Sequence, residues 1–75
     1  MYESIEVVDE GKFIEINFMQ KRIEKSCYNE LIGIFERHPP ETIFIIDFTR
    51  VVNVDRTLIH DIGKLIKHNT VKLRV

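Results

Sequence analysis

Apolar and polar residues alternate with a period of two in residues 4–8 and again in residues 13–18. Such alternation is typical of strands that bury one face. The short segment between them contains Gly11, which can adopt the left-handed conformation that a bulged hairpin needs. We therefore expect residues 4–18 to form an antiparallel hairpin. In its second strand, Ile14, Ile16 and Phe18 share one face.

The pattern then changes to a helical period in two later segments. The first apolar stripe predicts a helix that ends before Pro39, because proline disfavours helical geometry in the residue before it. The second stripe predicts another helix, with Asp55 as its N-cap. Gly63 within that helix costs about 1 kcal/mol relative to alanine, so we expect close packing against another backbone there. The two stripes consist of Ile23, Cys27, Leu31, Ile34 and Phe35, and of Leu58, Ile59, Ile62, Leu65 and Ile66.

Two more segments predict the remaining strands and complete the fold. Residues 43–46 are apolar at every position, which is typical of a central strand, and residues 71–75 alternate. The predicted fold is α/β with the order ββαβαβ, as a single domain over residues 1–75. Right-handed crossovers place both helices on one face of a four-stranded mixed sheet with strand order 1-2-3-4. Phe44 and Ile46 should point to the uncovered face, so we expect that face or an edge strand to take part in association.

Composition narrows the classes of function. With 44% hydrophobic and 31% charged residues in 75 positions, the chain is typical of one small globular domain and not of a disordered segment. The net charge of −1 argues against a nucleic-acid partner. No apolar run approaches the roughly 20 residues that span a bilayer, so we expect no membrane insertion. Cys27 is the only cysteine, which excludes an internal disulfide and favours a cytoplasmic location.

One stretch carries a family resemblance. A hydrophobic strand is followed by Asp47-Phe48-Thr49, a spacer, a hydrophobic residue and then Asp55-Arg56-Thr57. This pattern resembles the signature of the sulfate transporter and anti-sigma factor antagonist (STAS) family, whose elements also follow the predicted order. His60-Asp61-Ile62 is more similar to the stressosome branch than to the glycine-rich antagonists.

The resemblance implies a small bacterial regulatory domain that is no enzyme, needs no cofactor and docks onto a protein. The partner would be a kinase-like protein, an ATPase or a scaffold. In antagonist-type members, a Ser or Thr after the second Asp is phosphorylated by a partner kinase. By position, Asp47 and Asp55 match the two acidic residues, while Arg56 occupies the place of the phosphoacceptor.

Three departures from the family pattern bear on the predicted mechanism. Arg56 cannot be phosphorylated in that manner, and Thr57, one residue later, is the candidate substitute. Residues 19–22 replace a glycine-containing loop, and the sequence ends at Val75, where typical members continue with another helix. The predicted partner-binding residues are Asp55, Arg56, Thr57 and His60. Arg56 is interpreted either as a contact to an acidic partner or as a solvated surface residue.

Other interpretations of the polar residues are weaker. Asp47 is interpreted as a turn-forming residue. Its place after a strand is also similar to the phosphoacceptor of receiver domains, but Glu6, Asp9 and Glu10 do not supply the acidic pair that holds magnesium there. His60 and His68 lie two helical turns apart, which favours a solvated helix face over a metal site.

No spacing of Ser, His and acidic residues predicts a catalytic site. The alternative function is a self-associating structural protein of the same fold without a phospho-switch, and in either case we expect a homo-oligomer.

Overall fold

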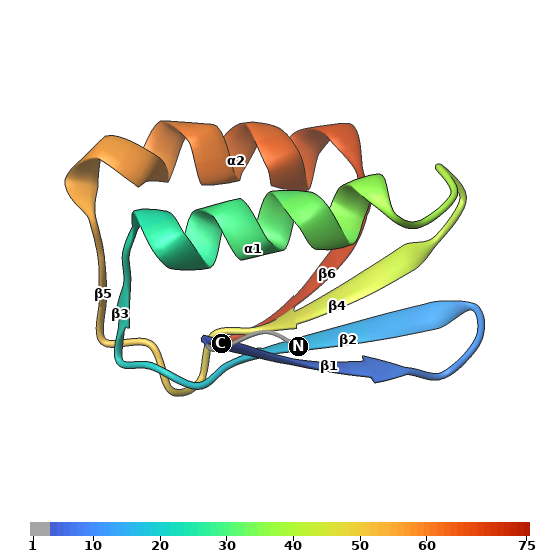
Figure 1. Cartoon of the computed structure of the whole chain (residues 1–75), viewed down its shortest axis with the longest axis horizontal. Helices are drawn as coiled ribbons and strands as arrows, with labels where there is room; N and C mark the ends of the chain where they lie inside the picture. Colours follow the sequence, from blue (N-terminus) through green and yellow to red (C-terminus); the bar gives the residue numbers. More distant parts are fainter. Residues whose placement is uncertain (1–3) are drawn as a thin grey trace.

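The computed structural model describes residues 4–75 and has an α/β fold, in which one sheet carries both helices on the same side (Figure 1). The elements in chain order are β1 (Ile5–Asp9), β2 (Phe13–Phe18), β3 (Arg22–Ile23), α1 (Lys25–Glu36), β4 (Ile43–Asp47), β5 (Asn53–Val54), a 3-10 turn η1 (Arg56–Leu58), α2 (Ile59–His68) and β6 (Thr70–Arg74). Neither helix of this described part has the length and apolar character needed to cross a membrane. The single domain over residues 1–75 stays a prediction, and residues 1–3 lie outside the described residues.

Four of the strands form one mixed sheet. β1 pairs antiparallel with β2, and β4 pairs parallel with both β2 and β6, so the order is β1-β2-β4-β6. The four-stranded mixed sheet and the two helices agree with the prediction, but the strand order is not the predicted 1-2-3-4. The difference arises because two short strands, β3 and β5, were missed. They pair with each other outside this sheet and are too short to show an alternating pattern.

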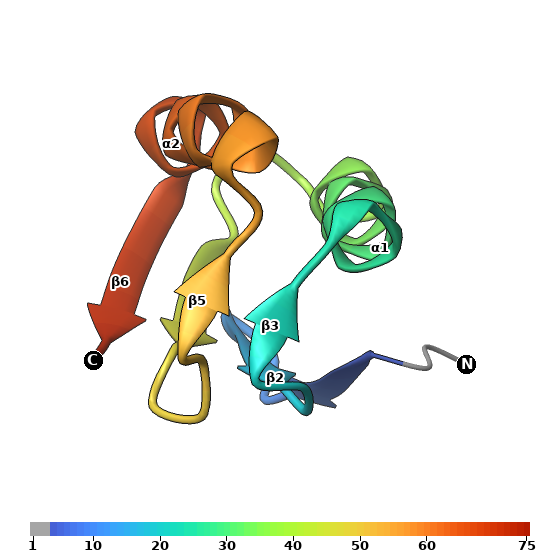
Figure 2. The same cartoon turned by 90° about the vertical axis from the view of Figure 1, so that its left-hand side faces the viewer.

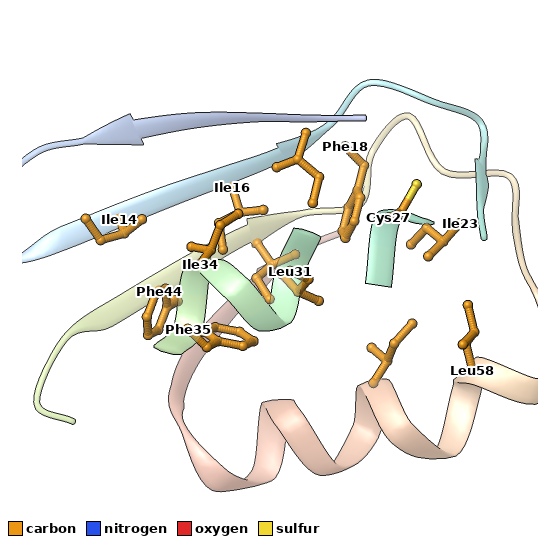
Figure 3. Close-up of a cluster of buried hydrophobic side chains, with 13 residues drawn as sticks. Ile14, Ile16, Phe18, Ile23, Cys27, Leu31, Ile34, Phe35, Phe44 and Leu58 are labelled. Carbon is orange, nitrogen blue, oxygen red and sulfur yellow. The ribbon is translucent and has the colours of Figure 1, made fainter. Parts of the chain in front are cut away.

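The core lies between this sheet and the two helices (Figure 3). In the parallel register of β2 and β4, Ile14 pairs with Phe44 and Ile16 pairs with Ile46, and all four side chains are buried. The ring of Phe35 in α1 meets the ring of Phe44 edge-on, with centroids 4.4 Å apart. The prediction that Phe44 and Ile46 point to the uncovered face is therefore wrong. Every residue of 43–46 is apolar, so alternation could not assign the faces of this strand.

The uncovered face of the sheet carries charged side chains together with the apolar Val8 and Phe13, which are each 37% exposed. Ile43 and Ile45 lie on it but are half-buried. Across this face, Nη1 of Arg74 in β6 donates a hydrogen bond of 2.7 Å to Oε1 of Glu15 in β2, bridging over β4. This face therefore combines an ion pair within the chain with exposed apolar side chains other than those predicted, and its part in association stays a prediction.

Both helices differ from the prediction at their first residues. α1 begins at Lys25, and Ile23, predicted as the first residue of the helical stripe, lies in β3 instead. The second helical segment begins with η1, and its core side is formed by the buried Leu58 of η1 and Ile62 of α2, whereas Ile59, the first residue of α2, is 57% exposed. Close packing at Gly63 was also predicted wrongly, because no atom outside its own helix lies within 4 Å of where a Cβ would be.

Candidate functional site

The segment that resembles the family signature leaves the sheet after β4 and returns to the core through β5. There it pairs with the segment that follows β2: Arg22 lies beside Asn53, and Ile23 beside Val54, in parallel register. Figure 2 shows β3 and β5 side by side, with β3 leading into α1 and β5 leading toward α2. The backbone N–H of Asp55 donates to the carbonyl of Ile23 at 2.9 Å, which extends this pairing to the start of η1. The short pair therefore fixes where the second helical segment begins.

Further backbone bonds hold the same loop at both ends. The N–H of Val52 donates to the carbonyl of Lys21 at 2.6 Å, and the N–H of Phe48 donates to the carbonyl of Arg74 at 2.8 Å. Ile23 and Leu58 are buried on either side of the segment, so they anchor it to the core. Sequence reasoning did not predict these contacts between the segment after β2 and the signature. Residues 19–22 indicated only a departure from the family pattern, without any pattern that predicts pairing.

Two turns of the same construction begin and end the signature. Asp47 Oδ1 accepts hydrogen bonds from the backbone N–H and the hydroxyl of Thr49, at 2.8 and 2.5 Å. Asp55 Oδ1 accepts the same pair from Thr57, at 3.0 Å from the N–H and 2.8 Å from the hydroxyl. Asp55 thereby caps η1. In each Asp-x-Thr turn the aspartate fixes the local backbone and the threonine hydroxyl is already engaged.

These hydrogen bonds favour the ionised form of both aspartates. The side-chain and backbone hydrogen bonds from Thr49 lower the pKa of Asp47, and Arg74 and Arg50 add a smaller electrostatic contribution. The backbone and side-chain hydrogen bonds from Thr57 lower the pKa of Asp55, with a smaller contribution from Arg22. A carboxylate with a lowered pKa is a weak base near neutral pH, so the arrangement suits neither side chain to proton transfer there.

Arg22 is a residue of the site that sequence reasoning did not identify. It lies in β3, with Nη2 4.0 Å from Oδ2 of Asp55 and Nε 3.6 Å from Oε1 of Glu24. Its side chain is 55% exposed, so these ion pairs are screened by solvent and contribute little to stability. The cation facing the second carboxylate oxygen adds only a small contribution to the lowered pKa of Asp55, after the hydrogen bonds from Thr57.

The four predicted partner-binding residues lie along one short segment that crosses from β5 into α2. Arg56, Thr57 and His60 are exposed, and Asp55 is half-buried. Within residues 4–75, the side chains of Arg56 and His60 make no hydrogen bond or ion pair. The segment therefore presents an exposed cation and an exposed imidazole from a backbone that is fixed by the Asp55 turn.

Asp47 belongs to a different surface. Together with Thr49 and Arg50 it lines an open hollow of about 290 Å³ at the end of the sheet, bounded on the other side by Asn17 and Glu6. A separate hollow runs along α2 and is lined by His60 but not by either aspartate. The two acidic residues of the signature thus do not combine into one pocket.

Neither a metal centre nor a reactive thiol emerges from the described side chains. In residues 4–75 no three His, Cys, Asp or Glu side chains are grouped so that they could hold a metal ion. Cys27 is fully buried in the core. Its Sγ donates a weak hydrogen bond of 3.5 Å to Oε1 of Gln20. A buried thiol of this kind packs as a small apolar side chain.

Comparisons with models of known protein families, with curated proteins and with solved structures found no match to the chain.

Proposed function

We propose that the chain is a non-enzymatic regulatory module that binds a protein partner through Asp55, Arg56, Thr57 and His60, which we call the docking surface. The observation that carries this proposal is the contrast between a fixed backbone and free side chains. Backbone bonds from Asp55 and the Asp55 turn hold the segment. Arg56 and His60 are exposed on it.

A surface of this kind is suited to binding a protein. Ordering flexible backbone on association costs free energy, and a segment already held in place avoids most of that cost. Arginine is also enriched at protein interfaces, where its guanidinium can bind a carboxylate through two parallel hydrogen bonds. The resemblance to the STAS family supports the same location, because Arg56 occupies the position next to the second aspartate of the signature.

We propose further that this binding is not switched by phosphorylation. Arg56 stands at the phosphoacceptor position, and the hydroxyl of Thr57 donates to Asp55 Oδ1. A phosphate on Thr57 would remove this donor and place its negative charge beside the Asp55 carboxylate, which opposes the turn. Partner capture would then be constitutive.

A second candidate function is self-association through the edge of the sheet. Among the described strands β6 pairs only with β4, so its other edge has free backbone groups, and Leu73 on it is 49% exposed. Such an edge can pair with a second chain, although Lys72 and Arg74 are charges of the kind that discourage this.

The replacement of Arg56 by Glu separates the two candidates. The chain is used as bait in affinity capture at native expression levels, with Lys12→Glu as the matched control. Lys12 is an exposed cation in the β1–β2 turn, at the far end of the molecule from η1 (Figure 1). The same variants are measured by sedimentation equilibrium.

For the docking surface, we expect a partner that the wild type and Lys12→Glu capture and that Arg56→Glu loses. A captured protein retained equally by Arg56→Glu would contradict the proposal. Self-association that persists in Arg56→Glu, with no captured partner, would instead favour the second candidate.

A further inference from the structure

The outer face of α2 carries two parallel rows of side chains. Residues four apart on a helix lie on one face, one turn above the other. One row contains His60, Lys64 and His68, and the other contains Ile59, Gly63 and Lys67. All six are exposed, with Ile59 at 57%. Arg56 lies four residues before His60, so the rows continue the docking surface along the helix.

This face is the positive part of an otherwise acidic chain. Residues 56–68, which form η1 and α2, contain three Lys and Arg (Arg56, Lys64 and Lys67) and a single acidic residue, Asp61, whereas the whole chain has a net charge of −1. Asp61 is half-buried and lies on neither row. The segregation gives α2 a local positive field, which attracts negatively charged partners and raises their rate of association.

Between the two rows lies a shallow, open groove of about 500 Å³, lined by Ile59, His60, Gly63, Lys64, Lys67 and His68. A Cβ at Gly63 would meet no atom outside its own helix within 4 Å. The missing side chain at Gly63 therefore leaves a gap between Ile59, one turn before it, and Lys67, one turn after it. The groove offers the apolar side chain of Ile59 at one end, and the rest of its rim consists of two lysines and two histidines.

We propose that this groove binds an acidic protein segment that inserts one apolar side chain at Gly63. The carboxylates of the segment would pair with Lys64 and Lys67 while its apolar side chain contacts Ile59. This inference rests on the proposed docking surface and specifies the chemistry of the partner.

The same observations disfavour two other negatively charged partners. Nucleic acid would use the lysines through its phosphates but would leave the apolar side chain of Ile59 without a partner. A lipid surface requires a broad apolar helix face, whereas the apolar residues of α2 other than Ile59 are buried or half-buried against the core.

The experiment titrates the full chain, labelled with ¹⁵N, with a short acidic peptide that contains one central Leu. The acidic residues of this peptide are Glu. One control peptide has Ser in place of the Leu, and another has Lys in place of every Glu. Duplex DNA and anionic vesicles serve as further probes. We expect amide shifts confined to α2 and η1 with the acidic Leu peptide, weakened by salt because exposed charges are screened. The Ser peptide should bind several-fold more weakly and the Lys peptide not at all.

Variants of the chain locate the contact. Lys64→Glu/Lys67→Glu should weaken the acidic peptide about tenfold or more, and Lys64→Gln/Lys67→Gln by less. Lys12→Glu/Lys72→Glu makes the same charge change at two exposed lysines, one in the β1–β2 turn and one on the sheet face away from the helices, and should leave binding unchanged. Gly63→Leu replaces glycine by a good helix former, so the helix should stay intact while the added side chain fills the gap. It should reduce the preference for the Leu peptide over the Ser peptide.

The inference would be overturned if the affinity for the acidic Leu peptide were unchanged by both the lysine and the Gly63 substitutions. Tighter binding of DNA or vesicles than of the peptide would also overturn it. Concentration-dependent self-association with α2 as its contact would overturn it too. A captured partner that is lost by Arg56→Glu but kept by Lys64→Glu/Lys67→Glu would leave the docking surface standing and reject the groove alone.

Discussion

Replacing Gly63 by Ala should stabilise the protein. Gly63 is the fifth of the ten residues of α2, so it lies in the helix interior, where glycine is least favourable. Its backbone has no positive φ, and a Cβ at this position meets no atom outside its own helix within 4 Å. Alanine can therefore be added without strain or steric conflict.

The magnitude follows from helix propensity and the unfolded state. Alanine is about 0.8–1 kcal/mol more favourable than glycine in a helix interior, partly because glycine loses more backbone entropy on folding. The added methyl is exposed, so burial adds little. For a domain of this size, a gain of about 1 kcal/mol corresponds to a rise in melting temperature of roughly 4–8 °C.

Gly11→Ala is the matched control with the opposite sign. Gly11 has φ +84° in the turn between β1 and β2, a region that costs a residue with a Cβ about 1–2 kcal/mol. Urea unfolding followed by circular dichroism gives the free energy of unfolding for both variants, with an unchanged denaturant slope as the test of an unaltered two-state transition. A Gly63→Ala variant that is neutral or less stable would refute the assignment of this residue to an exposed, regular helix.

Two further predictions test the faces of β4 and the role of the Asp55 turn. Ile46→Ala should lower the free energy of unfolding by about 2–5 kcal/mol, whereas Ile45→Ala on the uncovered face should lower it by less than about 1 kcal/mol, as measured by urea unfolding. Equal losses would contradict the assigned faces. Because the folded pKa of Asp55 lies below its ordinary value of 3.8, its ionised form contributes stability above that pH, and the contribution is lost as the pH falls through the lowered pKa. Asp55→Asn should therefore show a shallower loss of stability below pH 3.8 in an acid titration of urea midpoints, and an unchanged slope would argue against the Thr57 contacts.

Periodicity predicted the parts of the fold in which one side of an element is polar. The alternation of β2 predicted correctly that Ile14, Ile16 and Phe18 share a buried face, and the stripe of α1 predicted the buried Cys27 and Leu31. The same reasoning failed where the pattern is uniform or short. Continuous apolar residues in β4 contain no information about faces, and only the register with β2 places Phe44 in the core.

At the candidate site, the sequence predicted the position of the turn but not what holds it. Asp55 was expected to cap the following helical segment, and it accepts the N–H of Thr57 there. The pairing of β3 with β5 joins residues that are about thirty positions apart, and two-residue strands have no pattern from which it could be predicted. Arg22 near Asp55 is a consequence of that pairing, so it was missed for the same reason.

The two faces of α2 separate stability from recognition. Leu58 and Ile62 hold the segment to the core, so charge changes on the outer rows can alter binding without unfolding the chain. Gly63 affects both stability and recognition, because the glycine lowers helix stability and also keeps the groove open. Proteins commonly give up stability at positions that serve a binding function. If the groove is used as proposed, Gly63→Ala should raise the free energy of unfolding and weaken the acidic Leu peptide in the same variant, whereas a glycine with no such role would give the first change without the second.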